Sequence, residues 1–297
     1  MKKTIQRINL NFRTSRFLAQ IANLLILKRP SRIFWTWELY GLGYSLKHVQ
    51  GISQRRRIST SSDHGISFYI DPFSEESAIP ANTHVTWSKW RTSLQFPDGR
   101  KVIRVRHPWI EYRKMHGFSL SRKASGTLVF VPHSFPGLSS EFQILNYLKL
   151  VSSLPKDFHP LVFCLQMHDV KKDLVHAIHN KGYSVVTVGN SLHPRYVHRF
   201  YGLLKNFEFA TSPTVGSQLF YAHEFGVKYF LFDPENEFQR RLNFESPRQI
   251  HNDVIKRIEN AFQLQNLFDQ PAEKNYLVSE ALGLDCEGLN LSDLFDE

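Results

Sequence analysis

Five short apolar runs follow one another in the second half of the chain, and more polar segments separate them. Each run is almost continuously apolar, which is typical of parallel strands covered on both faces. The runs are TLVFVPH (127–133), PLVFCLQ (160–166), YSVVTVG (183–189), FEFATS (207–212) and KYFLFD (228–233). The segments between them carry apolar residues at helical spacing, such as Phe142, Leu145 and Leu148. This alternation predicts a doubly wound α/β domain with a parallel sheet and few possible topologies.

The first 116 residues are less regular but contain three further candidate strands. Each of these runs into a polar loop, and they are RISTSSDHG (57–65), THVTWS (83–88) and KVIRVRHP (101–108). They predict a smaller α/β domain.

Two features divide the chain. GFSLSRKASG (117–126) has the composition of a linker, and the segment from residue 247 carries an apolar stripe at helical spacing. We therefore expect an N-terminal α/β domain at 1–122, a Rossmann-like domain at 123–246 and C-terminal helices at 247–297.

The net charge of +10 is unevenly distributed. Residues 1–57 hold twelve Lys and Arg against Glu38 alone, whereas residues 261–297 hold eight acids against Lys274 alone. A basic end attracts anionic lipid, nucleic acid or a polyanionic substrate, unless it is only a solvated face.

The apolar run FLAQIANLLIL (17–27) is too short to span a membrane, and no small-residue cleavage site follows it. It suits either a core-facing helix or a basic amphipathic helix on a membrane surface. Two cysteines, Cys164 and Cys286, fit a reducing compartment. We expect a cytoplasmic protein, with peripheral contact to the inner face of the plasma membrane through the basic N-terminus.

The segment after the fourth apolar run has the residue types of an anion site. Ser212, Thr214, Gly216 and Ser217 lie where a strand ends and a helix begins. The first N–H groups of a helix have no partner within it, so they bind anions together with nearby hydroxyls. A helix cap explains the same residues equally well.

Other strand ends carry similar residues. They are His133 and Ser134 after the first run, His168 and Asp169 after the second, and Asn190, Ser191 and His193 after the third. Because parallel strands end on one rim, the four groups together predict a cleft for a phosphorylated ligand.

Several short motifs resemble those of GT-B glycosyltransferases, and more specifically those of bacterial surface-polysaccharide biosynthesis (capsule or O-antigen). The spacing of Gly216, Ala222 and Gly226 before a strand resembles their donor-site loop and helix. The other matching pieces are WTWELYGLGYS (35–45), SDHGI (62–66), HVTWS (84–88), RHPWIEYR (106–113), PHS (132–134) and GSQLFYA (216–222).

The resemblance implies two Rossmann-like domains facing a cleft, with the last helices crossing back to the first domain. The nucleotide-sugar donor would lie on the C-terminal domain and the acceptor, a glycan or lipid-linked glycan, would face the N-terminal one. It implies sugar transfer to a growing bacterial surface glycan, with no cofactor other than the donor substrate.

One departure concerns the donor. Many retaining GT-B enzymes carry two glutamates around this loop, and Pro213 and Tyr221 stand at the corresponding positions. A standard UDP- or GDP-sugar site is therefore in doubt. The serine-rich loop resembles the phosphate-binding end of sialyl- and Kdo-transferase-like enzymes, which favours a CMP-sugar.

The SSDHG segment (61–65) is the best candidate for acid–base chemistry, because transfer by inversion needs a base for the acceptor hydroxyl. Asp63 would be the base and His64 would orient it or contact phosphate; an Asx turn is the structural alternative. By the same strand-end argument, His84, His107 and Arg113 would line the acceptor side. Neither histidine spacing nor the isolated cysteines indicate a metal site.

Three other classes remain open. The pI of 9.6 suggests a nucleic-acid-binding protein, but the charge lies away from the α/β core and no nucleic-acid motif appears, so we expect no nucleic acid partner. The missing glutamates keep a non-catalytic partner in polysaccharide assembly open. A sugar-nucleotide epimerase shares the architecture but usually brings acidic catalytic residues.

Overall fold

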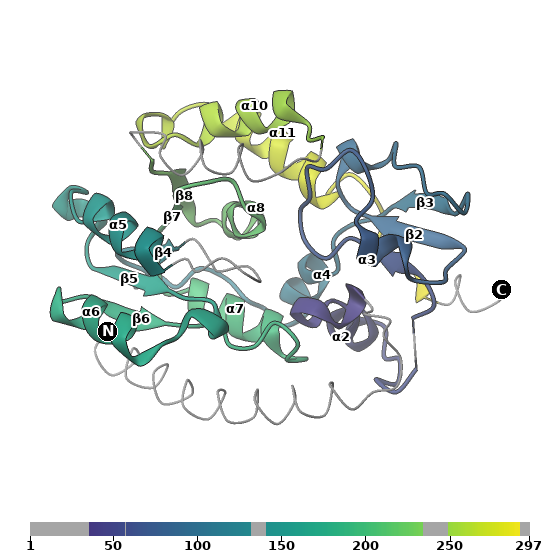
Figure 1. Cartoon of the computed structure of the whole chain (residues 1–297), viewed down its shortest axis with the longest axis horizontal. Helices are drawn as coiled ribbons and strands as arrows, with labels where there is room; N and C mark the ends of the chain where they lie inside the picture. Colours follow the sequence, from purple (N-terminus) through teal and green to yellow (C-terminus); the bar gives the residue numbers. More distant parts are fainter. Residues whose placement is uncertain (1–35, 57, 132–140, 234–248, 292–297) are drawn as a thin grey trace.

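The computed structural model of the chain describes residues 36–56, 58–131, 141–233 and 249–291, and it contains two parallel β-sheets. Figure 1 shows these sheets at opposite ends of the view, with helices α10 and α11 above them. The apolar run at 17–27 and the candidate site residues His133 and Ser134 lie outside the described residues.

The larger sheet confirms the five strands predicted in the second half of the chain. Its strands are β4 (Thr127–Phe130), β5 (Leu161–Cys164), β6 (Ser184–Val186), β7 (Phe209–Ser212) and β8 (Lys228–Leu231). They are all parallel, in the order β6-β5-β4-β7-β8. The chain therefore winds outwards from β4 in one direction and from β7 in the other. The boundary between β4 and β7 is the topological switch point, where ligands bind in open α/β sheets.

Helices cover both faces of this sheet, which explains why its strands are apolar at nearly every position. On one face Val129, Phe163 and Phe230 pack in a core with residues of α5 and α6. On the other face, Ala210 and Tyr229 pack with residues of α7 and α8. These helices are α5 (Glu141–Val151), α6 (Lys172–Asn180), α7 (Tyr196–Leu204) and α8 (Ser217–Glu224), and short 3-10 turns η3 (Lys156–Phe158) and η4 (Met167–Asp169) flank β5.

The smaller sheet confirms the three candidate strands of the first half. Its parallel strands lie in the order β1-β2-β3, so the whole fold is mixed α/β with parallel sheets. The strands are β1 (Ser61–Ser62), β2 (Thr83–Thr86) and β3 (Lys101–Arg104). The helical elements of this half are η1 (Thr36–Gly41), α2 (Leu42–Val49), α3 (Ser74–Ser77), η2 (Lys89–Arg91) and α4 (Pro108–Met115).

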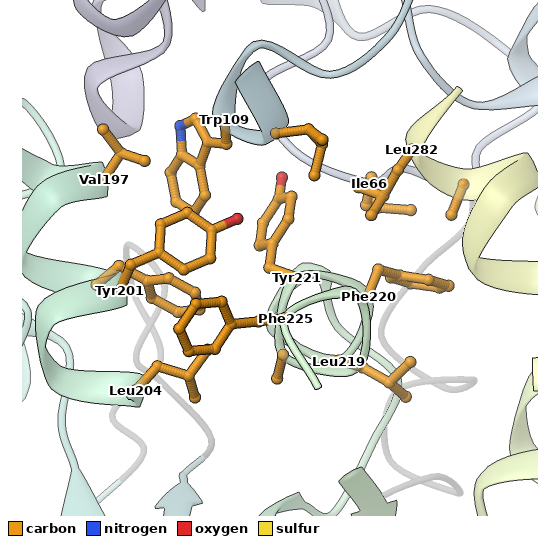
Figure 2. Close-up of a cluster of buried hydrophobic side chains, with 14 of the residues drawn as sticks. Ile66, Trp109, Val197, Tyr201, Leu204, Leu219, Phe220, Tyr221, Phe225 and Leu282 are labelled. Carbon is orange, nitrogen blue, oxygen red and sulfur yellow. The ribbon is translucent and has the colours of Figure 1, made fainter. Parts of the chain in front are cut away.

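Aromatic side chains join the two halves into one core, which Figure 2 shows around α8. The ring of Trp109 from α4 lies 4.5 Å from that of Tyr221 on α8 and 5.3 Å from that of Phe200 on α7. Arg113 of α4 also pairs with Glu224 at the end of α8. The two halves are thus packed together where α4 meets α7 and α8. An open cleft between two domains remains a prediction.

The C-terminal segment contacts elements of both halves, and in the second half His223 Nε2 of α8 lies 3.0 Å from Asn275 Oδ1. Its elements are α10 (Asn252–Phe262), η5 (Leu264–Asn266) and α11 (Pro271–Leu282). The Ser88 hydroxyl donates to Ala281 O at 3.2 Å, and His107 N donates to Leu282 O at 2.9 Å. Gly283 ends α11 with φ 60°, and a Cβ there would lie 2.4 Å from Val105 O, so glycine is needed for this close approach. Among the described residues, no helix is both long and apolar enough to cross a membrane.

Candidate functional site

The start of α8 lies at the switch point of the larger sheet. Strand β7 ends at Ser212, and α8 begins at Ser217 with Gly216 as its N-cap and no side-chain cap hydrogen bond. Residues 214–218 are half-buried rather than covered. The first N–H groups of such a helix are oriented to bind an anion at the rim of the sheet.

A loop from the smaller sheet reaches this helix start. The backbone N–H of Ile66 donates to Ser217 Oγ at 2.8 Å. Gly65 approaches so closely that a Cβ on it would lie 2.8 Å from the same oxygen. The Trp87 indole N–H donates to Gly65 O at 2.8 Å and fixes the loop from the other side. The 62–66 motif and the 216–222 motif, far apart in the sequence, therefore meet.

His64 lies between these fixed residues. Asp63, Gly65 and Ile66 are each held by hydrogen bonds, so the backbone at His64 has little freedom. Its ring packs edge-on against Phe73 at 5.3 Å between centroids and is half-buried. His64 is thus a half-buried candidate catalytic side chain on the loop that meets the start of α8.

Asp63 occupies a different environment from the one expected of a base. Its side chain is 0% exposed. Its Oδ1 accepts from Arg91 Nη2 at 2.8 Å and lies 3.1 Å from His84 Nε2, while Oδ2 accepts from Thr86 Oγ1 at 2.6 Å. A base must reach the acceptor hydroxyl, which a fully enclosed carboxylate does not. We therefore correct the expectation for Asp63: its contacts suit a residue that positions the loop.

Arg91 is the centre of this buried network. Its Nη2 also donates to Glu76 Oε2 at 2.7 Å, so one guanidinium bridges two carboxylates. Burial alone would raise the pKa of Asp63, but the charge of Arg91 and the hydrogen bonds from His84 and Thr86 hold it below its ordinary range. The pKa of Glu76 is raised by burial and by the neighbouring charge of Asp63.

Asp63, Glu76 and His84 bring three possible metal-ligand atoms within 4.8 Å of one another. The guanidinium of Arg91, however, is bonded to both carboxylates and already supplies the positive charge that a metal ion would bring. The donor set is therefore better explained as a buried ion-pair network than as a metal site.

Two of the three residues expected on the acceptor side, His84 and His107, are enclosed within the fold, and those two expectations are also corrected. His84 and His107 are each 0% exposed. His84 Nδ1 lies 2.9 Å from Ser61 Oγ, and His107 Nε2 lies 3.0 Å from the Tyr221 hydroxyl. Arg113 is tied to α8 through Glu224. Neither histidine presents its polar atoms to a ligand in this arrangement, whereas the Arg113 side chain is 15% exposed and its place on the acceptor side stays a prediction.

The residues expected to bind donor phosphate divide into two groups. Thr214, Gly216 and Ser217 lie together at the start of α8. Ser212 lies beneath them, because its buried hydroxyl donates to Thr214 O at 2.6 Å and accepts from Tyr229.

The other two donor-site candidates lie further along the same rim. His168 follows β5, with Nε2 3.3 Å from Asp169 Oδ2. Asn190 follows β6, and its Oδ1 accepts from Leu192 N at 3.0 Å. In the strand order β6-β5-β4-β7-β8, His168 and Asn190 therefore follow strands that lie two and three spacings from β7, where α8 starts.

Sequence reasoning missed Arg91, Glu76 and Trp87 as supports of the 63–66 loop. Trp87 belongs to the HVTWS motif, but its bond to the loop, like that of Arg91, depends on the pairing of strands far apart in sequence, and Glu76 acts on the loop only through Arg91. Only the WSKWR stretch (87–91), with two tryptophans and two cations after a strand, was a local signal.

The contact between the loop and α8 gives a direct prediction. Gly65→Ala is expected to lower the free energy of unfolding by about 1–3 kcal/mol, because the new methyl group overlaps Ser217 Oγ. In a Ser217→Ala background the same change should cost about 1 kcal/mol less, since the nearest remaining Ser217 side-chain atom is 3.8 Å away. Denaturant unfolding of the four proteins in this cycle measures the difference. Equal costs in both backgrounds would contradict the contact.

Comparison with known proteins gives little further information. No family model matches the sequence, and no curated protein matches it. Among solved structures, the wall teichoic acid polymerase TagF, determined as a histidine-to-asparagine variant soaked with CDPG, aligns with a TM-score of 0.41 and 9% identity. The alignment covers 80% of this chain and 65% of that one. A likeness this distant carries no inference about activity.

Proposed function

We propose that the chain is a glycosyltransferase that moves a sugar from a nucleotide-sugar donor to a bacterial surface glycan. The observation that carries the proposal is the hydrogen bond from Ile66 N to Ser217 Oγ. It supports the proposal because it joins the loop that carries His64 to the start of a helix at the switch point of a parallel sheet.

In this proposal the start of α8 binds the donor phosphate. Ser217 Oγ accepts the Ile66 amide and keeps its own hydrogen to donate, and Thr214 adds a second hydroxyl. Gly216 has no Cβ, and the Gln218 side-chain amide fills that space, with its Oε1 2.5 Å from the Cβ position. These donors stabilise the negative charge that develops on the leaving nucleotide. No metal ion is needed for that role.

His64 acts as the base. The acceptor hydroxyl oxygen forms a bond to the anomeric carbon while the bond from that carbon to the donor phosphate oxygen breaks. The hydroxyl proton passes to the His64 imidazole, and the bonding electrons leave with the nucleotide phosphate at α8. Asp63 does not contact the substrate and instead holds the loop through Arg91 and Thr86.

The resemblance to GT-B enzymes favours a CMP-sugar donor and a glycan or lipid-linked acceptor, and the basic N-terminus suits contact with the inner face of the plasma membrane.

One observation favours a second candidate, a non-catalytic partner in polysaccharide assembly. Tyr221, at a position where retaining GT-B enzymes carry a glutamate, is 5% exposed and bonded to His107, so it is not available to a donor.

Purified protein incubated with CMP-, UDP-, GDP- and TDP-sugars tests the proposal. At least one donor should raise the melting temperature by mass action and should be hydrolysed or transferred. His64→Asn should lower the turnover by about 100-fold or more while donor binding persists. His176→Asn, on the exposed side of α6, is the matched control and should retain full turnover. Donor binding without turnover would favour the non-catalytic partner, and no binding of any donor would contradict both.

A further inference from the structure

Three potential cationic or donor side chains lie where the loop after β6 enters α7: His193 and Arg195 on the loop, and Arg199 in the first turn of the helix. The first half of the chain holds this loop in place. Tyr40 N donates to Ser191 O at 2.5 Å, and a Cβ on Gly41 would lie 2.4 Å from Pro194 O. The positions of these side chains are therefore set by tertiary contacts.

His193 faces two hydrogen-bond donors. Its Nδ1 accepts from Arg195 N at 3.0 Å, and its Nε2 lies 3.2 Å from Arg199 Nη2. The imidazole is neutral near pH 7, because burial and then the charges of Arg199 and Arg195 lower the pKa of His193 to about 4. A neutral imidazole has one accepting nitrogen and one N–H group. Because Nδ1 is the accepting nitrogen, Nε2 carries the hydrogen. The N–H groups of His193 Nε2 and Arg199 Nη2 then face each other without an acceptor between them.

The other terminal nitrogen of Arg199, Nη1, also lacks an acceptor. It is buried and has no hydrogen-bond partner among the described residues. Burial and the charge of Arg195 lower the pKa of the Arg199 guanidinium, and no carboxylate in the described part of the chain offsets them. Unpaired buried donors and an uncompensated charge cost free energy, and one bound oxyanion would remove both costs.

We propose that His193 and Arg199, with Arg195 beside them, form a binding site for a phosphate oxyanion. Arg199 donates from Nη1 and Nη2, and His193 donates from Nε2 while Nδ1 keeps its bond to Arg195 N. Strand β6 lies three strand spacings, about 14 Å, from β7. The proposed site is therefore on the same rim of the sheet as the start of α8 but is separate from it. The proposal does not depend on the transferase activity.

Calorimetric titration of the full chain with inorganic phosphate, at constant ionic strength in chloride, tests the site. Arg199→Gln should weaken phosphate binding about tenfold, because it removes a charged donor pair. His193→Asn should weaken it severalfold, since the asparagine oxygen can still accept from Arg195 N but the Nε2 donor is gone. Arg122→Gln, at an exposed position, is the control and should leave binding unchanged.

Nuclear magnetic resonance of the His193 ring gives a readout that a structural role would not produce. Phosphate should raise the pKa of this imidazole, because the anion offsets the charges of Arg195 and Arg199. Equal phosphate affinity in wild type and Arg199→Gln, or a His193 ring unaffected by millimolar phosphate, would overturn the proposal. If Arg199→Gln does not fold, His193→Asn and the ring titration decide.

Two further arms identify the source of the phosphate and separate this site from the α8 start. A sugar phosphate that binds more tightly than inorganic phosphate assigns the site to a larger ligand, whereas weaker binding assigns it to free phosphate. Ser217→Ala should leave the His193 response intact. Loss of that response in Ser217→Ala would mean that phosphate acts from the α8 site, which contradicts a separate site at His193.

Discussion

Arg91→Met is expected to lower the free energy of unfolding by about 3–5 kcal/mol. The substitution leaves the carboxylates of Asp63 and Glu76 buried next to each other without the guanidinium that bridges them. Two such carboxylates repel each other, and each has lost the solvation of water. The loss should therefore be several times larger than for an ordinary surface charge.

Equilibrium denaturation with urea measures this loss. Arg257→Met is the matched control, because Arg257 pairs with Glu273 on the surface, where the side chains are 48% and 38% exposed, and it should cost about 1 kcal/mol or less. Adding Asp63→Asn and Glu76→Gln to Arg91→Met removes the orphaned charges and should restore part of the stability. A cost below about 1 kcal/mol for Arg91→Met alone would show that the network does not stabilise the fold.

Acidification is expected to destabilise the protein through His107. Burial lowers the pKa of His107 from 6.5 to about 3, so the folded state keeps the ring neutral while the unfolded state takes up a proton. The stability from this residue is therefore fully present above pH 6.5 and is lost as the pH falls towards 3. The expected loss from His107 alone is about 2 kcal/mol at pH 5 and about 4 kcal/mol at pH 3.

His107→Asn isolates this contribution. Asparagine is also a good N-cap and can accept the hydrogen bond that Trp109 N now donates to His107 Nδ1, but it does not titrate. The variant loses the contact with Tyr221 at every pH, so only the slope of stability against pH is compared. Between pH 7 and 5 the wild type should lose about 2 kcal/mol more than the variant. Parallel pH profiles would contradict the assignment.

The strands of both sheets could be predicted from the sequence because each strand is a short, local pattern. The nearly continuous apolar runs around Val129, Phe163 and Phe230 follow directly from helices packed on both faces of the sheet. The start of α8 was also predictable, since Gly216 and Ser217 lie just after a strand and before an apolar helical repeat.

The roles of individual polar residues were harder to predict, because burial depends on contacts between distant segments. Asp63 and His84 have the residue types of catalytic groups, but strand pairing and Arg91 enclose them completely. His107 is also completely buried, because α8 and α11 cover it. A strand-end position predicts the rim on which a residue lies, and it does not predict which side chains of that rim face solvent.

The proposed arrangement requires little movement, because the 63–66 loop already lies at the start of α8. The loop is already hydrogen-bonded to Ser217, and the aromatic core around Trp109 and Tyr221 holds the two halves together. Preorganised donors of this kind stabilise charge without reorganisation during the reaction. For the same reason, a small change in the loop, such as a methyl group at Gly65, is expected to lower the free energy of unfolding.

The central claim, that α8 begins at a phosphate site, is tested most directly by amide chemical shifts of residues 216–218 during titration with nucleotides. CMP, the nucleotide of the favoured donor, should shift the amides of Ser217 and Gln218, while cytidine without the phosphate should leave them nearly unchanged, because the phosphate accepts from these N–H groups. Equal shifts with CMP and cytidine, or CMP shifts confined to other parts of the chain, would contradict the claim.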